Sequence, residues 1–121
     1  MKSLNYNNFI NELELKNKLC VPLGVTKENV LIEIDLEKYP NILINGYCGS
    51  GKSVFIECLL ATLLLKNNSD DLKLVLIDTK QVELHMFRKL PHLMFPIVHN
   101  GKEAMEVVSK LINIAKNICF E

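Results

Sequence analysis

One eight-residue segment constrains this sequence more than any other feature. Residues 46–53 read Gly-Tyr-Cys-Gly-Ser-Gly-Lys-Ser and fit the pattern G-x-x-x-x-G-K-[ST]. Glycines at these positions let backbone N–H groups turn toward phosphate oxygens, and the N-terminus of a following helix attracts the same anion. An apolar segment, residues 42–44, precedes the motif, and a longer apolar segment, residues 54–66, follows it. The pattern and its setting predict a phosphate-binding loop between a buried strand and a helix.

Each position of the loop has an expected role. Lys52 is expected to neutralise the β- and γ-phosphates of ATP, and the Ser53 hydroxyl is expected to ligate Mg²⁺. A glycine-rich turn that binds nothing is the plain alternative, but a chance match in so short a chain has a probability of roughly a few in a thousand. The sequence therefore predicts ATP and Mg²⁺ as ligands. The expected ATP-binding residues are Gly46, Tyr47, Cys48, Gly49, Ser50, Gly51, Lys52 and Ser53.

The segments around the loop predict an α/β fold. Residues 20–36 are typical of two short strands around a turn, because apolar and polar side chains alternate in the second of them. Residues 72–77 (LKLVLI) are typical of another buried strand, which ends at Asp78. A strand, a helix and a strand in this order favour parallel pairing of residues 42–44 with residues 72–77.

Two helical segments are expected near the end of the chain. Residues 81–90 predict a short turn-helix that Pro91 stops. Asn100 is placed to cap a longer helix, with Glu103 three residues later. One stripe of this helix is apolar and is expected to face a core. Its members are Ala104, Val107, Val108, Leu111, Ile112, Ala115 and Ile118.

Composition limits the classes of function. The chain has 121 residues, with fourteen basic and fourteen acidic side chains, so one domain is expected and no global charge attracts nucleic acid. Its longest apolar stretch is shorter than the ~20 residues that span a bilayer, and the first residues do not resemble a signal or transit peptide. The four cysteines have no metal-site spacing, so reduced thiols in a cytoplasm are expected.

Other chemistry-bearing residues give weaker signals. Asp78 and Glu83 are the candidate catalytic carboxylates, with a structural or solvated role as the alternative. The histidines at positions 85, 92 and 99 recur every seven residues, but prolines between them and the lack of a completing ligand favour three ordinary histidines over a metal site. Cys48 lies inside the loop, where a redox role competes with that of a small spacer.

Beyond the loop, the chain resembles the motor domain of the FtsK/SpoIIIE family of DNA translocases. The resemblance runs from about Phe9 to Val108. Its remaining parts are residues 23–27 and 33–36, the approach Tyr39-Pro40-Asn41-Ile42-Leu43-Ile44-Asn45-Gly46, Ile77-Asp78-Thr79-Lys80 with Glu83-Leu84, Leu90-Pro91-His92-Leu93, Val98, and Glu103-Ala104. Asn41 stands where the family usually has His, and Thr79 where it usually has Pro.

The resemblance implies a P-loop NTPase fold with part of a RecA-like parallel sheet and an N-terminal β-hairpin lead-in. Residues 1–19 are then a helical lead-in, and residues 20–121 part of an ATP-binding domain. Family members form rings that pump double-stranded DNA with ATP, so DNA is a partner by resemblance only. Asp78, Lys80 and Glu83 fall in a signature segment, for which a structural or subunit-coupling role is expected.

The departures from the family limit the expected activity. The strand ending in Asp-Glu, which supplies the family's catalytic acids, and the DNA-gripping loops lie beyond residue 121, and the single arginine, Arg88, falls where the family has none. We expect ATP binding without hydrolysis or DNA pumping by this chain alone, which requires a completing half-motor or ring. A non-hydrolysing or regulatory nucleotide-binding module of a larger ring is the alternative. Residues 41–45 are expected to keep one unpaired strand edge, which predicts that the chain is marginally stable, or soluble only with a partner that completes the sheet.

Overall fold

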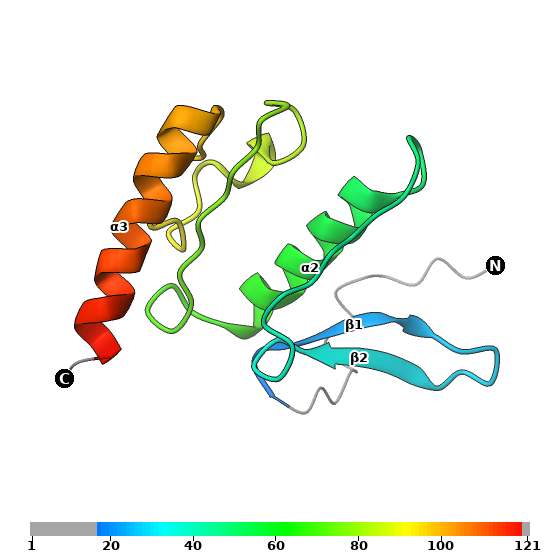
Figure 1. Cartoon of the computed structure of the whole chain (residues 1–121). Helices are drawn as coiled ribbons and strands as arrows, with labels where there is room; N and C mark the ends of the chain where they lie inside the picture. Colours follow the sequence, from blue (N-terminus) through cyan, green and yellow to red (C-terminus); the bar gives the residue numbers. More distant parts are fainter. Residues whose placement is uncertain (1–16, 120–121) are drawn as a thin grey trace. The chain divides into compact units, whose positions relative to one another are not determined.

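The computed structural model of the chain describes residues 17–119, which form two compact units, one up to Asn68 and the other from Ser69 (Figure 1). Most of the expected helical lead-in, residues 1–19, lies outside the described residues. Its last part, residues 17–19, forms a turn that leads into the first strand. The expected domain boundary after residue 19 stays a prediction.

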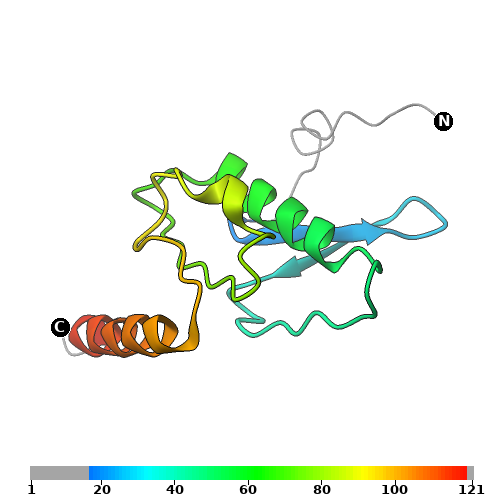
Figure 2. The same ribbon diagram turned by 90° about the horizontal axis from the view of Figure 1, so that it is seen from above.

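A β-hairpin opens the first unit, as the alternation in residues 20–36 predicts. Strand β1 (Cys20–Val25) pairs antiparallel with β2 (Leu31–Asp35) (Figure 2). The register is irregular between Pro22 and Gly24. The Thr26 hydroxyl closes the turn by accepting hydrogen bonds from the N–H groups of Glu28, at 3.2 Å, and Val30, at 3.3 Å. This side-chain closure suits a polar turn between two apolar strands.

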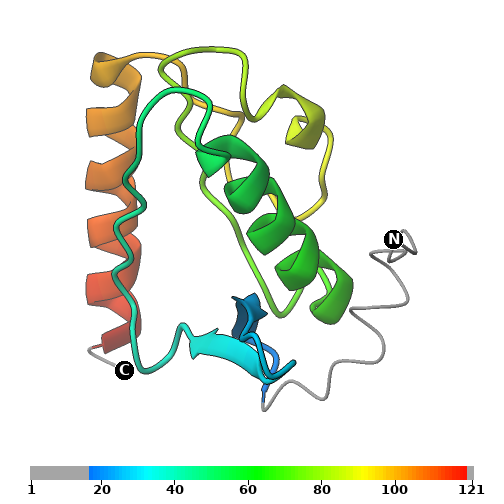
Figure 3. The same ribbon diagram turned by 90° about the vertical axis from the view of Figure 1, so that its right-hand side faces the viewer.

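Helix α2 (Lys52–Lys66) supplies the rest of the first unit's core. It packs against β1 (Figure 3). Its buried residues are Leu60, Thr62 and Leu63. At its C-terminus the Asn67 side chain donates hydrogen bonds to the carbonyl oxygens of Leu63, at 2.8 Å, and Lys18, at 3.0 Å. Asn67 therefore ties the end of the helix to the start of the hairpin.

The prediction of a buried strand at residues 42–44 is wrong. In the structure this segment is irregular, and the Leu43 side chain is 91% exposed. A strand forms only when a neighbouring backbone accepts and donates its ladder hydrogen bonds. Among the described residues the only ladder is the β1–β2 hairpin, so residues 42–44 have no partner strand.

The second predicted strand, residues 72–77, is present only as two isolated parallel bridges. Leu74 pairs with Leu93, and Ile77 pairs with Val98. The bonds between the N–H of Leu74 and the carbonyl of His92, and between the N–H of Asp78 and the carbonyl of Val98, are both 2.8 Å long. The predicted parallel pairing of this segment with residues 42–44 is therefore wrong, because its partners come from residues 92–98.

Helical turns complete the second unit. The turn-helix expected within residues 81–90 is a short 3₁₀ helix, η1 (His85–Phe87). Helix α3 (Gly101–Cys119) begins as predicted, because the Asn100 carboxamide oxygen accepts a hydrogen bond of 3.0 Å from the Glu103 N–H. No helix in the described part of the chain has the length and apolarity that crossing a bilayer requires.

The prediction that the apolar stripe of α3 faces a core is wrong for most of the helix, because most of the stripe is exposed. Val107 is buried, but Ile112 and Ile118 are 50% and 70% exposed. Within the second unit, residues 95–98 lie along the first half of α3, where the Lys110 ammonium sits 5.7 Å from the centre of the Phe95 ring. Periodicity predicts which residues share a face, but it does not predict how much of that face a neighbour covers.

Candidate functional site

The eight-residue loop lies wholly within the first unit and leads directly into α2. Its backbone depends on glycine, because Gly49 and Gly51 have φ angles of +80° and +89°, values that residues with a Cβ rarely adopt. The Ser50 N–H donates to the Tyr47 carbonyl oxygen at 3.2 Å and forms a tight turn inside the loop. The chain thus reverses direction immediately before the helix begins.

The N-terminus of α2 has no internal acceptor for its first N–H groups. Gly51 occupies the cap position without a side-chain hydrogen bond, and the first helical turn contains no acidic residue. The Phe55 N–H makes the first helical bond, 2.9 Å to the Gly51 carbonyl oxygen. The N–H groups of the preceding turn therefore combine with the positive end of the helix dipole to favour an anion.

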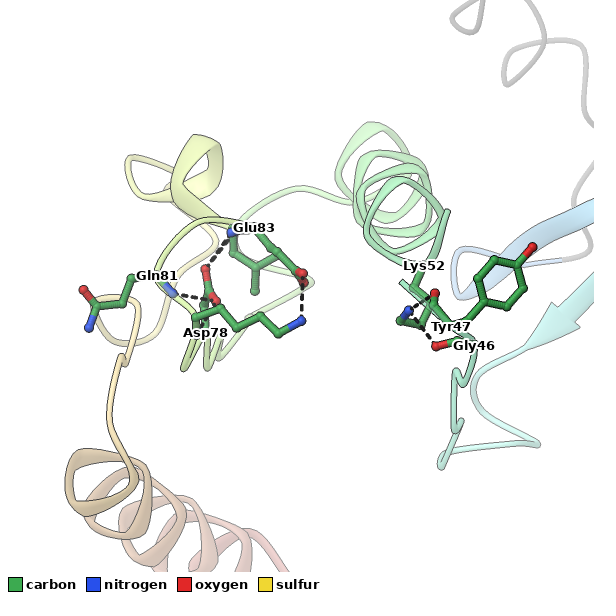
Figure 4. Close-up of polar contacts among 8 residues, drawn as sticks. Gly46, Tyr47, Lys52, Asp78, Gln81 and Glu83 are labelled. Carbon is green, nitrogen blue, oxygen red and sulfur yellow. Dashed lines mark hydrogen bonds and ion pairs between the residues drawn. The ribbon is translucent and has the colours of Figure 1, made fainter. Parts of the chain in front are cut away.

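Lys52 holds the loop closed. Its ammonium group donates hydrogen bonds of 2.8 Å to the carbonyl oxygens of Gly46 and Tyr47, at the opposite end of the motif (Figure 4). Gly46 also packs closely against Ser50, since a Cβ at position 46 would lie 2.5 Å from the Ser50 Oγ. The start of the motif is therefore close to both Ser50 and Lys52.

These features fit a nucleotide triphosphate with Mg²⁺. The loop offers a cation, uncapped helix N–H groups and, in the same helical turn, the half-buried Ser53 with a hydroxyl suited to a hard cation. Cys48 and Tyr47 are both exposed. These groups lie within residues 46–53 and the start of α2, and their use by a polyanion stays a prediction.

Asp78 forms a second cluster, in the second unit. Its Oδ1 accepts hydrogen bonds from the N–H groups of Lys80, at 3.1 Å, and Gln81, at 3.0 Å, and its Oδ2 accepts 3.0 Å bonds from Glu83 and Leu84 (Figure 4). These bonds, above all the one from the Leu84 N–H, lower the pKa of Asp78 from its ordinary value of 3.8, and burial of the carboxylate opposes this shift. The backbone therefore folds around an ionised carboxylate.

This environment favours a structural role for Asp78. Both carboxylate oxygens are used, and the loop they organise includes Gln81, whose φ of +62° is rare for a residue with a Cβ. The other candidate acid, Glu83, makes an exposed ion pair of 3.4 Å with Lys80. A catalytic role for either carboxylate stays a hypothesis.

The histidines of the second unit have separate surroundings. The His99 Nδ1 lies 3.1 Å from the Asp78 carbonyl oxygen, and the His85 ring contacts the Arg88 guanidinium. Among residues 17–119, no group of three metal-ligating side chains could hold an ion.

The four hydrogen bonds around the Asp78 carboxylate were not predicted from the sequence. An aspartate directly after a strand and before a polar turn is a general signal for such a side-chain-to-backbone turn. The number of N–H groups that converge on the carboxylate depends on the path of residues 79–84, which the signal does not specify.

Comparison with known proteins places the chain in a family. The sequence model described as the FtsK/SpoIIIE family matches residues 13–117. A protein named DNA translocase FtsK from Streptococcus pneumoniae is 34% identical over 106 residues, which are 88% of this chain and 14% of that protein. Proteins of the same name from Lactiplantibacillus plantarum and Caldanaerobacter subterraneus are each 40% identical over 94 residues, 78% of this chain and 12% and 13% of theirs. The chain thus spans about an eighth of the length of these relatives, and it belongs to the FtsK/SpoIIIE family.

Proposed function

We propose that this chain is the ATP-binding portion of an FtsK/SpoIIIE-like translocase of double-stranded DNA. The observation that carries the proposal is the closed loop at residues 46–53, in which the Lys52 ammonium bridges two loop carbonyls beside an uncapped helix N-terminus. The relatives' name supports the DNA-translocating role of the assembly. The family's use of cytoplasmic ATP leads us to place the chain in the cytoplasm.

The eight loop residues divide the binding of Mg-ATP between them. Backbone N–H groups of the glycine-rich turns and the first turn of α2 hold phosphate oxygens, and Lys52 exchanges its two carbonyl partners for phosphate charge. Ser53 supplies a hydroxyl ligand to Mg²⁺ that arrives with the nucleotide. The bound metal supplies charge neutralisation along the phosphate chain.

The contacts of Asp78 argue against this carboxylate as the base for ATP hydrolysis. Activation of a water molecule needs a carboxylate with a free lone pair near the γ-phosphate, and the four N–H bonds to Asp78 occupy its oxygens. We therefore propose that hydrolysis and DNA movement require a completing half-motor or a ring of subunits.

The test is equilibrium dialysis of labelled ATP in the presence of Mg²⁺ with the whole chain. Lys52→Ala is expected to weaken binding by roughly ten- to a hundredfold, because a charge-assisted hydrogen bond is lost. Lys66→Ala, at the other end of the same helix, is the matched control and is expected to bind as the parent does. Equal binding by the parent and Lys52→Ala, with both folded by circular dichroism, would contradict the proposal.

Phosphate release separates binding from turnover. The chain with saturating Mg-ATP, with and without duplex DNA, is expected to release phosphate no faster than Lys52→Ala. Steady release by the parent that Lys52→Ala abolishes would show that this chain hydrolyses ATP by itself.

A further inference from the structure

An apolar groove begins at the phosphate loop and runs along α2 in the first unit. Residues 22–24 of β1 form one wall, and Gly51, Val54, Phe55 and Cys58 form the other. Its volume is about 460 Å³, within the range of small-molecule sites. Gly51 belongs both to this groove and to the phosphate loop, so the two are continuous.

We infer that this groove holds the nucleobase of the bound nucleotide, and that it distinguishes poorly between bases. The inference rests on the proposed binding of ATP at residues 46–53. Phosphates held by the loop and by the first turn of α2 leave the sugar and base to continue from that end of the helix. The groove is the apolar surface that starts there.

The direction of the groove follows from helix geometry. Val54, Phe55 and Cys58 are separated by one and three residues, so they lie on neighbouring parts of one helix face that leads away from Gly51. Because α2 packs against β1, a planar ring between this face and residues 22–24 is contacted from both sides. Burying the two faces of a base in this way removes apolar surface from water.

The chemistry of the lining predicts weak base selection. Proline, leucine, glycine, valine and phenylalanine side chains offer no hydrogen-bonding group, and the Cys58 thiol is only a weak donor. A site discriminates strongly between similar ligands when it hydrogen-bonds the group that differs, whereas apolar contact does so weakly. The groove side chains therefore contact the faces of the base and form no strong hydrogen bonds with the edges of the base.

The experiment compares nucleotides with inorganic tripolyphosphate, which has the charge of the triphosphate but no base. Dissociation constants are measured by calorimetry with Mg²⁺ for ATP, GTP and tripolyphosphate. We expect ATP and GTP to agree within about fivefold and both to bind more tightly than tripolyphosphate. A preference of a hundredfold or more for one base would overturn the inference of weak selection.

Two substitutions test the groove itself. Leu23→Asn and Val54→Asn change side chains that are 42% and 61% exposed, so neither is expected to unfold the core. Each is expected to weaken ATP binding roughly three- to tenfold and to leave tripolyphosphate binding unchanged, because apolar contact with the base is lost. Ile32→Asn on β2, where the side chain is 46% exposed and outside the groove, is the matched control.

The outcomes separate the two proposals. Unchanged ATP binding in both groove variants, together with its loss in Lys52→Ala, overturns the base site and leaves the phosphate loop intact. Absence of binding for all three ligands overturns the proposed function. An equal loss of ATP and tripolyphosphate binding in the groove variants shows distortion of the loop and overturns the assignment of the base.

Discussion

At the scale of single residues, the Asp78 carboxylate accepts four backbone hydrogen bonds in the second unit. Asp78→Asn is expected to destabilise this unit, because the neutral amide replaces one acceptor oxygen by a donor that faces backbone N–H groups. Urea unfolding followed by circular dichroism measures the loss. Asp70→Asn, an exposed aspartate on a nearby turn, is the control, and an equal effect of the two substitutions would contradict the structural role.

The same carboxylate predicts a pH dependence. Because the folded pKa of Asp78 lies below the ordinary value of 3.8, its ionised form stabilises the folded state. This contribution is complete at pH values above the unfolded pKa and is lost as the pH falls through the folded pKa. The difference in unfolding free energy between the parent and Asp78→Asn is therefore expected to shrink below about pH 4. If the difference in unfolding free energy stayed constant from pH 7 to pH 3, the result would contradict a stabilising role of the ionised Asp78 carboxylate.

Close packing of Gly46 gives a second residue-scale prediction. In Gly46→Ala the new methyl group displaces the Ser50 side chain, and we expect about tenfold weaker ATP binding from this overpacking. Adding Ser50→Gly removes the clashing side chain and is expected to restore most of the affinity. Failure of the double variant to recover, while Ser50→Gly alone binds normally, would show that the contact is not the cause.

At the scale of elements, α3 depends on its cap. Asn100→Ala removes the acceptor for the Glu103 N–H and is expected to cost about 1 kcal/mol of helix stability. This loss of stability is measured by thermal melting, followed by the helical circular dichroism signal. Asn113→Ala, at an exposed position inside the same helix, is the control and is expected to preserve or raise the melting temperature, since alanine has the higher helix propensity.

The elements also show which parts of the fold the sequence predicts. The hairpin, α2 and the start of α3 were predictable because their hydrogen bonds join residues close in sequence, as between Asn100 and Glu103. Residues 42–44 and 72–77 have the composition of buried strands, but a strand needs a partner far along the chain. Leu74 forms a bridge with Leu93, and Ile77 forms one with Val98. Residues 42–44 have no strand partner among the described residues.

In the candidate site, too, the sequence predicts the local features and not those formed by separate elements. The motif predicts the position of the phosphate loop and the need for glycine at positions 49 and 51, because local backbone angles decide both. It does not predict the groove, since Leu23 and Val54 lie in separate elements that meet only when α2 packs on β1. Motif reasoning therefore predicts the local loop and misses surfaces that form only when separate elements pack together.

At the scale of the whole molecule, large apolar side chains remain on the surface of both units. Leu43 and Tyr47 are 91% and 82% exposed in the first unit, and Val82 and Ile118 are 73% and 70% exposed in the second. Exposed apolar patches favour association. The purified chain is therefore expected to bind a hydrophobic dye and to self-associate as its concentration rises, as measured by light scattering.

A substitution pair tests the cause of this association. Leu43→Gln is expected to reduce dye binding and association, whereas Asn41→Gln, which introduces the same residue two positions earlier, is expected to change neither. A monodisperse parent chain that unfolds cooperatively and binds no dye would contradict the prediction of marginal stability.

The ammonium of Lys52, held by the carbonyl oxygens of Gly46 and Tyr47, has a consequence for which anions the loop admits. An incoming ion must compete with two oriented dipoles that already solvate the cation. A singly charged ion such as chloride gains little over them, whereas a chain of phosphates brings several charges and several acceptors at once. We therefore expect Lys52 to leave its two carbonyl partners for a polyphosphate and to keep them in the presence of chloride.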